Sequence, residues 1–465
     1  MTTTIAVAWT RTWTTRALAL VLAIPLLLHL ASADAALWNK LLTLGLLVLS
    51  FTRPSSGLVA LAAILPLAPF AGLTPDRADA AASAFVVPVL LGAFLRVSPE
   101  RAPAVRWPAV PIFGLLVLIS AAAAPWRLWF ERGVDGFPMG HAAVIWIEAL
   151  ALAALAARLA RAHATHGATA VRALIAGASI AAIASAVAFW QLVSRDPAST
   201  SAATALLTVR LAPHFSDVNT AGSYVALFVV AALYLCLLLS QLSQLSRWLG
   251  WAVAAAPLVL ALWLTGSRTA LASAVVLGTA TWIASRHRRR ALLAAVVVLA
   301  LAVVGYLTFA TPTRVPQASP GYALHVRVEM AKVALQMAAA HPINGVGIGR
   351  FQQESRAWIS PSLATLFPPA AAGENAHNNF LQVMAEVGVP GLAAFCWMLA
   401  GPALLGWQSI RRGEARPELK ALGAGTLAFL LTCFAGHPLL STHVVFTFFF
   451  AAGLIRGLAE RSEIH

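Results

Sequence analysis

A set of arginines in or beside the loops expected on the outer side of the membrane are the first residues whose type points to a ligand. Their side chains are planar forks that can hydrogen-bond two oxygens of a phosphate or carboxylate at once. A group of them at the edge of a membrane predicts binding of a lipid-linked phosphate or pyrophosphate. The alternative is that they are solvated, or pair with glutamates such as Glu329, Glu354 and Glu374. The arginines are Arg210, Arg268, Arg314, Arg327 and Arg350.

Arg268 is the arginine whose surroundings leave it the least freedom. It stands in Thr265-Gly266-Ser267-Arg268, a turn with almost no loop between two apolar blocks. An arginine so close to hydrocarbon must find a partner or extend its side chain to the interface. We therefore expect Arg268 to bind a substrate or to brace the loops around it.

A histidine at the start of an apolar segment is the candidate base. His377 follows Glu374-Asn375-Ala376, where a long polar segment ends. A neutral imidazole is the usual general base for a hydroxyl nucleophile. Asn375 or Asn378 could cap a helix that begins here, and a helix N-terminus would lower the pKa of His377 and keep it neutral. The alternative is a structural histidine bonded to a loop carbonyl. Other histidines near polar segments weaken the inference from position alone: His214, His325, His341, His437 and His443.

Acidic residues within the apolar blocks are few. Glu148 lies in one block, where we expect a hydrogen-bonded partner, and Glu386 follows His377 in another. A proton-coupled carrier normally needs a denser set of buried ionisable groups. No cluster of residues has the spacing of a metal or nucleotide site, so we predict no metal and no cofactor. The cysteines each lie in an apolar block and predict no disulfide: Cys236, Cys396 and Cys433.

The apolar blocks are the elements that must position these residues. The chain has 465 residues and is 60% hydrophobic and 11% charged, whereas soluble domains are nearer half apolar and a quarter charged. A helix needs about 20 mostly apolar residues to span a bilayer, so we predict an all-α polytopic transmembrane bundle with about twelve to fourteen spans. The candidate spans are 17–33, 36–52, 57–72, 79–95, 108–124, 141–158, 173–194, 219–240, 249–264, 269–284, 291–310, 378–408, 420–436 and 442–458.

The basic residues fall between the apolar blocks, not on one soluble face. The formal net charge is +15, yet this distribution favours a phospholipid membrane over nucleic acid as the partner. Lys and Arg gather in the loops that are cytoplasmic if the N-terminus is cytoplasmic. We therefore expect both termini in the cytoplasm and an uncleaved first helix.

Two outer segments are long enough to hold a site. One is the loop at 195–218, within a transmembrane region at 1–310, and the other is the large loop at 311–376, ahead of a C-terminal transmembrane region at 377–465. Connections usually have about 4–6 residues, and much longer ones are usually functional or disordered. The large loop includes a helical stretch at 324–340 whose apolar stripe is typical of a helix lying on the bilayer or packed on the bundle. The stripe comprises Val326, Met330, Val333 and Met337.

Several of these segments together resemble the O-antigen ligases, within the wider O-antigen ligase/polymerase group of bacterial membrane glycosyltransferases. His377-Asn378, nine further residues and Gly388-Val389-Pro390-Gly391 are similar to the ligase signature. The resemblance covers roughly residues 205–395. The other matching motifs, in the family's order, are Arg210 through Asn219-Thr220-Ala221, Thr265 to Arg268, Arg327-x-Glu329, and His341 to Phe351 with its Gly345-Val346-Gly347-Ile348-Gly349 turn.

The resemblance implies a GT-C-like membrane glycosyltransferase of the bacterial inner membrane with its active site facing the periplasm. It implies transfer of an O-antigen polysaccharide from undecaprenyl pyrophosphate to a sugar hydroxyl of lipid A–core, with inversion and without a metal. His377 would be the base, and Arg210 and Arg327 would hold the donor pyrophosphate. The residues expected to bind substrate around them are Arg268, Arg350, Asn378 and Asn219.

Other functions stay open at this point. An O-antigen polymerase would use the same donor to extend a glycan, although the spacing between His377 and Gly391 favours the ligase. A protein O-glycosylating transferase is a second alternative, but those relatives often carry extra C-terminal sequence. A polysaccharide or lipid transporter, a different class of protein, would use the arginines as a binding site. The sparse membrane acids and the ordered loop motifs argue against that class.

Overall fold

The computed structural model describes most of the chain, and every regular element in it is a helix. The predicted all-α membrane bundle is thereby confirmed. The predicted spans at 17–33 and 291–310 lie largely or wholly outside the described residues, as do Arg314 and His214. The described residues are 26–27, 29–32, 36–71, 75–96, 107–125, 129–130, 139–195, 205–206, 209–213, 215, 217–240, 245–284, 320–371, 373–412 and 415–462.

The first half of the bundle follows the predicted apolar blocks closely. Pro54 opens its helix at the first turn, where the missing N–H leaves no bond unmade. The predicted block at 57–72 is divided, because a short 3₁₀ turn separates two α-helices. The elements are α2 (Leu37–Thr52), α3 (Pro54–Ile64), η1 (Leu65–Leu67), α4 (Ala68–Ala71), α5 (Pro75–Arg96), α6 (Ala109–Ala123), α7 (Met139–Ala162) and α8 (Ala164–Arg195).

The second half supplies the helices that carry the candidate site. By length and composition, five described helices could cross a membrane, namely α7, α8, α10, α18 and α20. Several shorter apolar helices accompany them. The remaining bundle elements are α10 (Val218–Ser240), α11 (Leu245–Thr265), α12 (Arg268–Ala284), α18 (Asn379–Arg411), α19 (Pro417–Thr432), η4 (Pro438–Leu440) and α20 (Thr442–Ser462).

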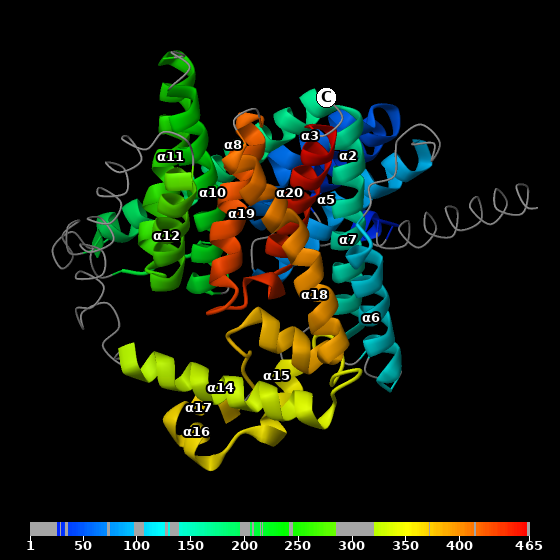
Figure 1. The fold of residues 1–465 in the computed structure, drawn as a ribbon, viewed down its shortest axis with the longest axis vertical. Helices are drawn as coiled ribbons and strands as arrows, with labels where there is room; N and C mark the ends of the chain where they lie inside the picture. The colour runs from blue at the N-terminus through cyan, green and yellow to red at the C-terminus, as the bar shows by residue number, and fades with distance from the viewer. Residues whose placement is uncertain are drawn as a thin grey trace, which may run out of the picture.

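A small helical layer covers one end of the bundle, opposite the C-terminus (Figure 1). We call this the α14 end. Its longest helix begins near the predicted helical stretch, and the four residues of the predicted apolar stripe are all buried. This helix packs on α18, so of the two expected placements, on the bilayer or packed on the bundle, the structure shows the second. The layer comprises α14 (Pro320–Ala340), α15 (Phe351–Glu354), η3 (Ser355–Trp358), α16 (Pro361–Leu366) and α17 (Pro368–Ala371).

Small residues allow the central helices to approach each other closely. Gly453 and Gly457 of α20 lie against the carbonyl groups of Ala153 and Ala157 of α7. Such contacts are common between helices in membranes, where close backbone packing replaces the hydrophobic drive. The predicted lone acid, Glu148, lies in this core and accepts a 2.6 Å hydrogen bond from the hydroxyl of Ser83, so its expected partner is confirmed.

Candidate active site

The start of α18 holds His377 in an unusual backbone conformation. His377 has φ 51°, and it is the one non-glycine residue with positive φ in the described part of the chain. Such a conformation costs free energy and gathers at functional sites. Next to it, Asn378 is the N-cap of α18, and its Oδ1 accepts from the backbone N–H groups of Phe380 (2.9 Å) and Leu381 (3.0 Å). The predicted cap is therefore Asn378, and it fixes the point where the chain turns into the helix.

The loop between α19 and α20 is tied to the same helix start. The backbone N–H of Asn379 donates to the carbonyl groups of Cys433 (3.0 Å) and Gly436 (3.1 Å). The Asn379 Oδ1 accepts from the backbone N–H of Leu439 at 3.3 Å. These bonds bring His437 beside His377, with ring centroids 5.1 Å apart and the ring planes tilted by 48°.

Arg210 is held by the short turn between α11 and α12. Its Nε donates to the carbonyl oxygen of Thr265 at 3.0 Å, and its Nη2 reaches the Oδ1 of Asn219 at 3.5 Å. Gly266 has φ 61°, and a Cβ there would stand 3.0 Å from Cγ and Nε of Arg210. The Thr-Gly-Ser-Arg turn therefore serves as a cradle for Arg210, because only glycine gives the guanidinium that close an approach.

Asp217 is an acidic residue of the site to which the sequence motifs assigned no role. Its carboxylate accepts from the backbone N–H of Thr220 at 2.7 Å and from the Nδ2 of Asn219 at 3.3 Å. Burial alone would raise the pKa of Asp217. The hydrogen bonds from Thr220 and Asn219, together with the positive charge that His437 can carry, hold this pKa below its usual value. Asp217 is therefore a fixed negative charge at the α14 end.

Arg210, Arg268 and Arg327 form an arginine cluster around Asp217. Burial lowers the pKa of Arg210 and of Arg327, and in each case Asp217 opposes that shift while Arg268 reinforces it. A guanidinium stays protonated in a protein, so these effects mean that the cluster holds more positive charge than its one aspartate balances. The structure thus brings together the arginines expected at the catalytic centre, and Arg268 is the exposed member.

The two histidines of the site are kept neutral by their surroundings. Burial lowers the pKa of His377, and Arg327 adds to this effect, whereas Glu374 and Asp217 oppose it. Burial likewise lowers the pKa of His437, to about 4, with contributions from His377 and Arg327 against Asp217. A neutral imidazole has one nitrogen able to accept a proton. The site therefore places a neutral imidazole, able to accept a proton, beside a cluster of positive charge.

Glu386 joins the glycine-rich turn to α18. Its carboxylate accepts from the backbone N–H groups of Gly349 (2.9 Å) and Phe351 (3.2 Å). The turn also packs on a kink of α18 at Gly388, where φ is 82° and ψ is 178°. A Cβ on Gly388 would clash with the carbonyl of Ile343. The residues between His377 and Gly388 therefore form the first part of α18. The glycine-rich turn binds to this part of the helix and so lies next to the site.

The remaining predicted site residues have partners within the protein. Arg350 is 6% exposed and pairs with Glu354 at 2.5 Å, so one of the predicted alternatives, pairing with a glutamate, holds for this arginine. Asn378 uses its Oδ1 as the helix cap and donates its Nδ2 to the carbonyl of Phe434 at 2.8 Å. Asn219 links Arg210 to Asp217. These contacts give Arg350 and Asn378 structural roles and give Asn219 a place in the arginine cluster.

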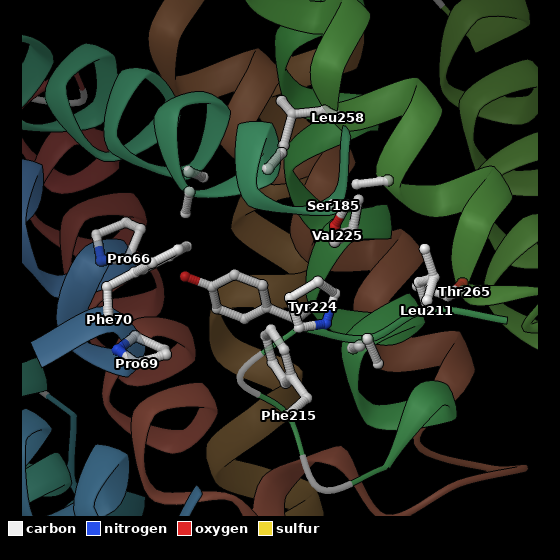
Figure 2. A pocket seen from close by; sticks show the side chains of 17 residues that line it. Pro66, Pro69, Phe70, Ser185, Leu211, Phe215, Tyr224, Val225, Leu258 and Thr265 are labelled. Carbon is white, nitrogen blue, oxygen red and sulfur yellow. The ribbon is translucent and has the colours of Figure 1, made fainter. Parts of the chain in front are cut away.

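A small cavity lies behind the loop that carries Arg210, and Figure 2 shows its lining. It measures about 30 Å³, enough for a water molecule but not for a sugar. Leu211 and Phe215 of the loop line it together with Tyr224 of α10. The Phe215 ring also packs against Tyr224 (5.4 Å) and His443 (4.7 Å between centroids). The cavity is thus part of the apolar base that anchors the Arg210 loop.

Sequence comparison finds a family match for the central part of the chain. Residues 253–396 match the family model described as O-antigen ligase, which confirms the resemblance drawn from the motifs over that range. The matched range contains the turn at Thr265, the glycine-rich turn and His377. Asp217 and His437 lie outside it. No curated protein matches the chain.

Proposed function

We propose that this protein is a membrane glycosyltransferase that transfers an O-antigen glycan from undecaprenyl pyrophosphate to a sugar hydroxyl of lipid A–core. One observation carries the proposal, which is that the arginine cluster and a neutral His377 meet at the α14 end of the bundle. The ligase family match over residues 253–396 supports a glycan-transferring activity. The periplasmic location of this end is part of the proposal.

The reaction needs a base and a site that offsets the charge of the leaving group. His377 takes the proton of the acceptor hydroxyl while its oxygen attacks the anomeric carbon of the donor. The bond between that carbon and the pyrophosphate oxygen breaks, and the electron pair leaves with undecaprenyl pyrophosphate. A direct displacement inverts the anomeric carbon. Arg210, Arg268 and Arg327 stabilise the charge that develops on the leaving oxygen, so the proposal includes no metal.

The base assignment predicts that His377→Ala abolishes transfer. The variant should insert and bind donor, because the Asn378 cap and the bonds of Asn379 do not use the imidazole. General-base catalysis contributes about 10²–10⁴-fold, and we expect a loss of that size. The measurement is glycan transfer in proteoliposomes with purified undecaprenyl-pyrophosphate glycan and lipid A–core.

His325→Ala is the matched control. This histidine is exposed on α14, one turn or less from Arg327, so its loss should leave transfer unchanged. Undiminished transfer by His377→Ala would refute the base role. The same reaction also tests the rival functions. Glycan lengthening on undecaprenyl pyrophosphate, without transfer to lipid A–core, would identify a polymerase. Movement of the donor across the membrane without any new glycosidic bond would identify a transporter.

A further inference from the structure

His437 has a buried polar atom that nothing in the described protein satisfies. Its Nδ1 is buried and has no hydrogen-bond partner among the described residues. Nearly all buried polar groups in native proteins are paired, so an exception needs an explanation. The residue also lies outside the range that matches the ligase family, and none of the sequence motifs includes it.

The position of the His437 ring is set by the backbone around it. The bonds from Asn379 to Cys433, Gly436 and Leu439 fix the loop on the start of α18. The carbonyl of His437 accepts from the N–H of Leu440 at 3.0 Å, and Pro438 follows directly. The ring is thus held 5.1 Å from that of His377, centroid to centroid, while its own Nδ1 stays unused.

We propose that His437 is a positioning residue for His377. When the acceptor sugar is bound, the ring N–H of His377 donates a hydrogen bond to the unpartnered Nδ1 of His437. This inference rests on the proposed function. The hydrogen bond fixes the tautomer of His377 and leaves its other nitrogen turned toward the acceptor hydroxyl. In other enzymes a third group orients the general base beside its nucleophile in the same way. Catalytic hydrogen bonds are often long without substrate and shorten in the complex.

The charges around the two rings suit this arrangement. His437 faces His377, Asp217 and Arg327, and His377 faces Glu374 as well. Burial keeps His437 neutral, because its pKa falls to about 4, so it remains an acceptor at neutral pH. When His377 takes the acceptor proton, the new imidazolium donates to His437, and Asp217 offsets the charge. His437 itself exchanges no proton in this step.

A pair of substitutions of similar size separates hydrogen bonding from packing. His437→Asn keeps an acceptor oxygen near the place of Nδ1, whereas His437→Leu has the same shape without one. For the leucine variant we expect a fall in kcat of about 10²-fold, the cost of a misplaced base, with the KM for donor unchanged. The asparagine variant should recover most of that loss. Activity is measured with the same proteoliposome reaction.

The pH profile gives a readout that a merely structural role would not move. Transfer needs neutral His377, so the rate falls as the pH drops through the pKa of His377. Without the acceptor on His437, the imidazolium of His377 is less stable and its pKa is lower. The acid limb of the leucine variant should therefore lie at lower pH than that of the wild type. Asp217, Glu374 and Arg327 are unchanged in every variant, so the shift reports His437.

Several outcomes would overturn the positioning role. Wild-type activity in His437→Leu would do so, as would equal losses in the leucine and asparagine variants with an unmoved acid limb. If the leucine variant fails to insert, His437→Phe, which retains an aromatic ring, replaces it in the comparison with asparagine. His325→Leu, exposed at the same end, is the control and should match the wild type. Failure of the proposed function is distinct, because the wild-type protein would then transfer no glycan at all.

Discussion

In the proposed function, Arg210 serves the fold and a ligand at once. Two of its donor groups are used inside the protein, by the Thr265 carbonyl and the Asn219 Oδ1. A guanidinium has five N–H donors in a fixed fork, so others remain for phosphate oxygens. The same two internal bonds set the direction of the fork, so the proposed binding of pyrophosphate depends on the orientation of Arg210.

The fork geometry predicts that Arg210→Lys impairs the reaction although the charge is kept. A lysine is a point charge that cannot bond Thr265 and a phosphate in the same arrangement. Loss of one charge-assisted hydrogen bond costs about 1.5–3 kcal/mol, so kcat/KM for donor should fall by at least about tenfold. Arg53 is exposed and lies between α2 and α3, so Arg53→Lys should leave kcat/KM for donor unchanged. A fully active Arg210→Lys would count against bidentate binding of pyrophosphate at this residue.

At the residue scale, the types of residue in the site were easier to predict from the sequence than the contacts that those residues make. Arg210, Arg268, Arg327 and His377 were predicted by type and motif, and the structure brings them together. Asp217 and His437 were not, because their roles depend on contacts between loops that are far apart in the chain. A signal was present, since both stand beside helix ends on the same predicted side of the membrane as His377. The pairing of Arg350 with Glu354 was one of two alternatives that sequence alone could not separate.

At the scale of elements, α18 and the glycine-rich turn form one structural unit. The backbone N–H groups of Val346 and Gly347 donate to the carbonyl groups of Ala385 (2.9 Å) and Glu386 (3.1 Å). Val389 donates in turn to the Pro342 carbonyl at 2.8 Å. Ser120 of α6 adds a 2.7 Å bond to the Glu386 carbonyl. The kink at Gly388 frees these backbone groups, so it joins the α14 layer to the bundle.

This unit predicts that Gly388→Ala destabilises the protein and displaces the turn. The φ and ψ at Gly388 fall in a region that only glycine populates, and strain there costs about 1–3 kcal/mol. Overlap of the new Cβ with the Ile343 carbonyl adds to that cost. We expect a lower thermal unfolding midpoint in detergent and reduced transfer. Gly45→Ala is the control, because nothing lies within 4 Å of its Cβ position, and alanine in a helix is favoured by about 0.5–1 kcal/mol. Equal midpoints for both variants would contradict the strain at Gly388.

The helices themselves were largely predictable, whereas the joints between them were not. Long apolar blocks define α7, α10 and α20 to within a few residues of the predicted bounds, because a span must satisfy its own backbone in lipid, whereas α8 begins at Ala164, nine residues before its predicted start. The kink in α18 was not predicted, since the hydropathy of 378–408 is continuous. Gly388 and Pro390 are local causes of the kink, because glycine alone adopts this conformation and proline has no N–H to continue the helix. The bonds that the glycine-rich turn makes with the freed backbone groups are tertiary contacts, which local sequence does not record.

At the scale of the whole molecule, the two ends of the bundle differ in how their charges are arranged. At the C-terminal end, arginines pair with glutamates, as in Arg161–Glu460 (3.1 Å), Arg456–Glu460 (2.8 Å) and Arg172–Glu418. At the α14 end, Arg350 also pairs with Glu354, but the three arginines of the cluster lie around one aspartate, Asp217. Short basic loops favour the cytoplasm, which supports placing the C-terminal end there and the α14 end in the periplasm.

This topology predicts opposite labelling of two engineered cysteines. In a variant with Cys236, Cys396 and Cys433 replaced by serine, Thr365→Cys adds a thiol on the exposed surface of α16 and Arg416→Cys adds one before α19. A membrane-impermeant maleimide applied to spheroplasts should label the cysteine at 365, because the proposed topology places it in the periplasm. The cysteine at 416 should react only after the membrane is opened.

The labelling pattern decides which pool of substrate the site can reach. A donor glycan carried on the periplasmic leaflet reaches His377 only if the α14 end faces that side, because a polar glycan does not cross the hydrocarbon core unaided. The reversed pattern would place His377 in the cytoplasm and would contradict the proposed transfer to lipid A–core at the periplasmic face. Retained transfer by each single-cysteine variant shows that the labelled molecules are folded, so the pattern then reports the native topology.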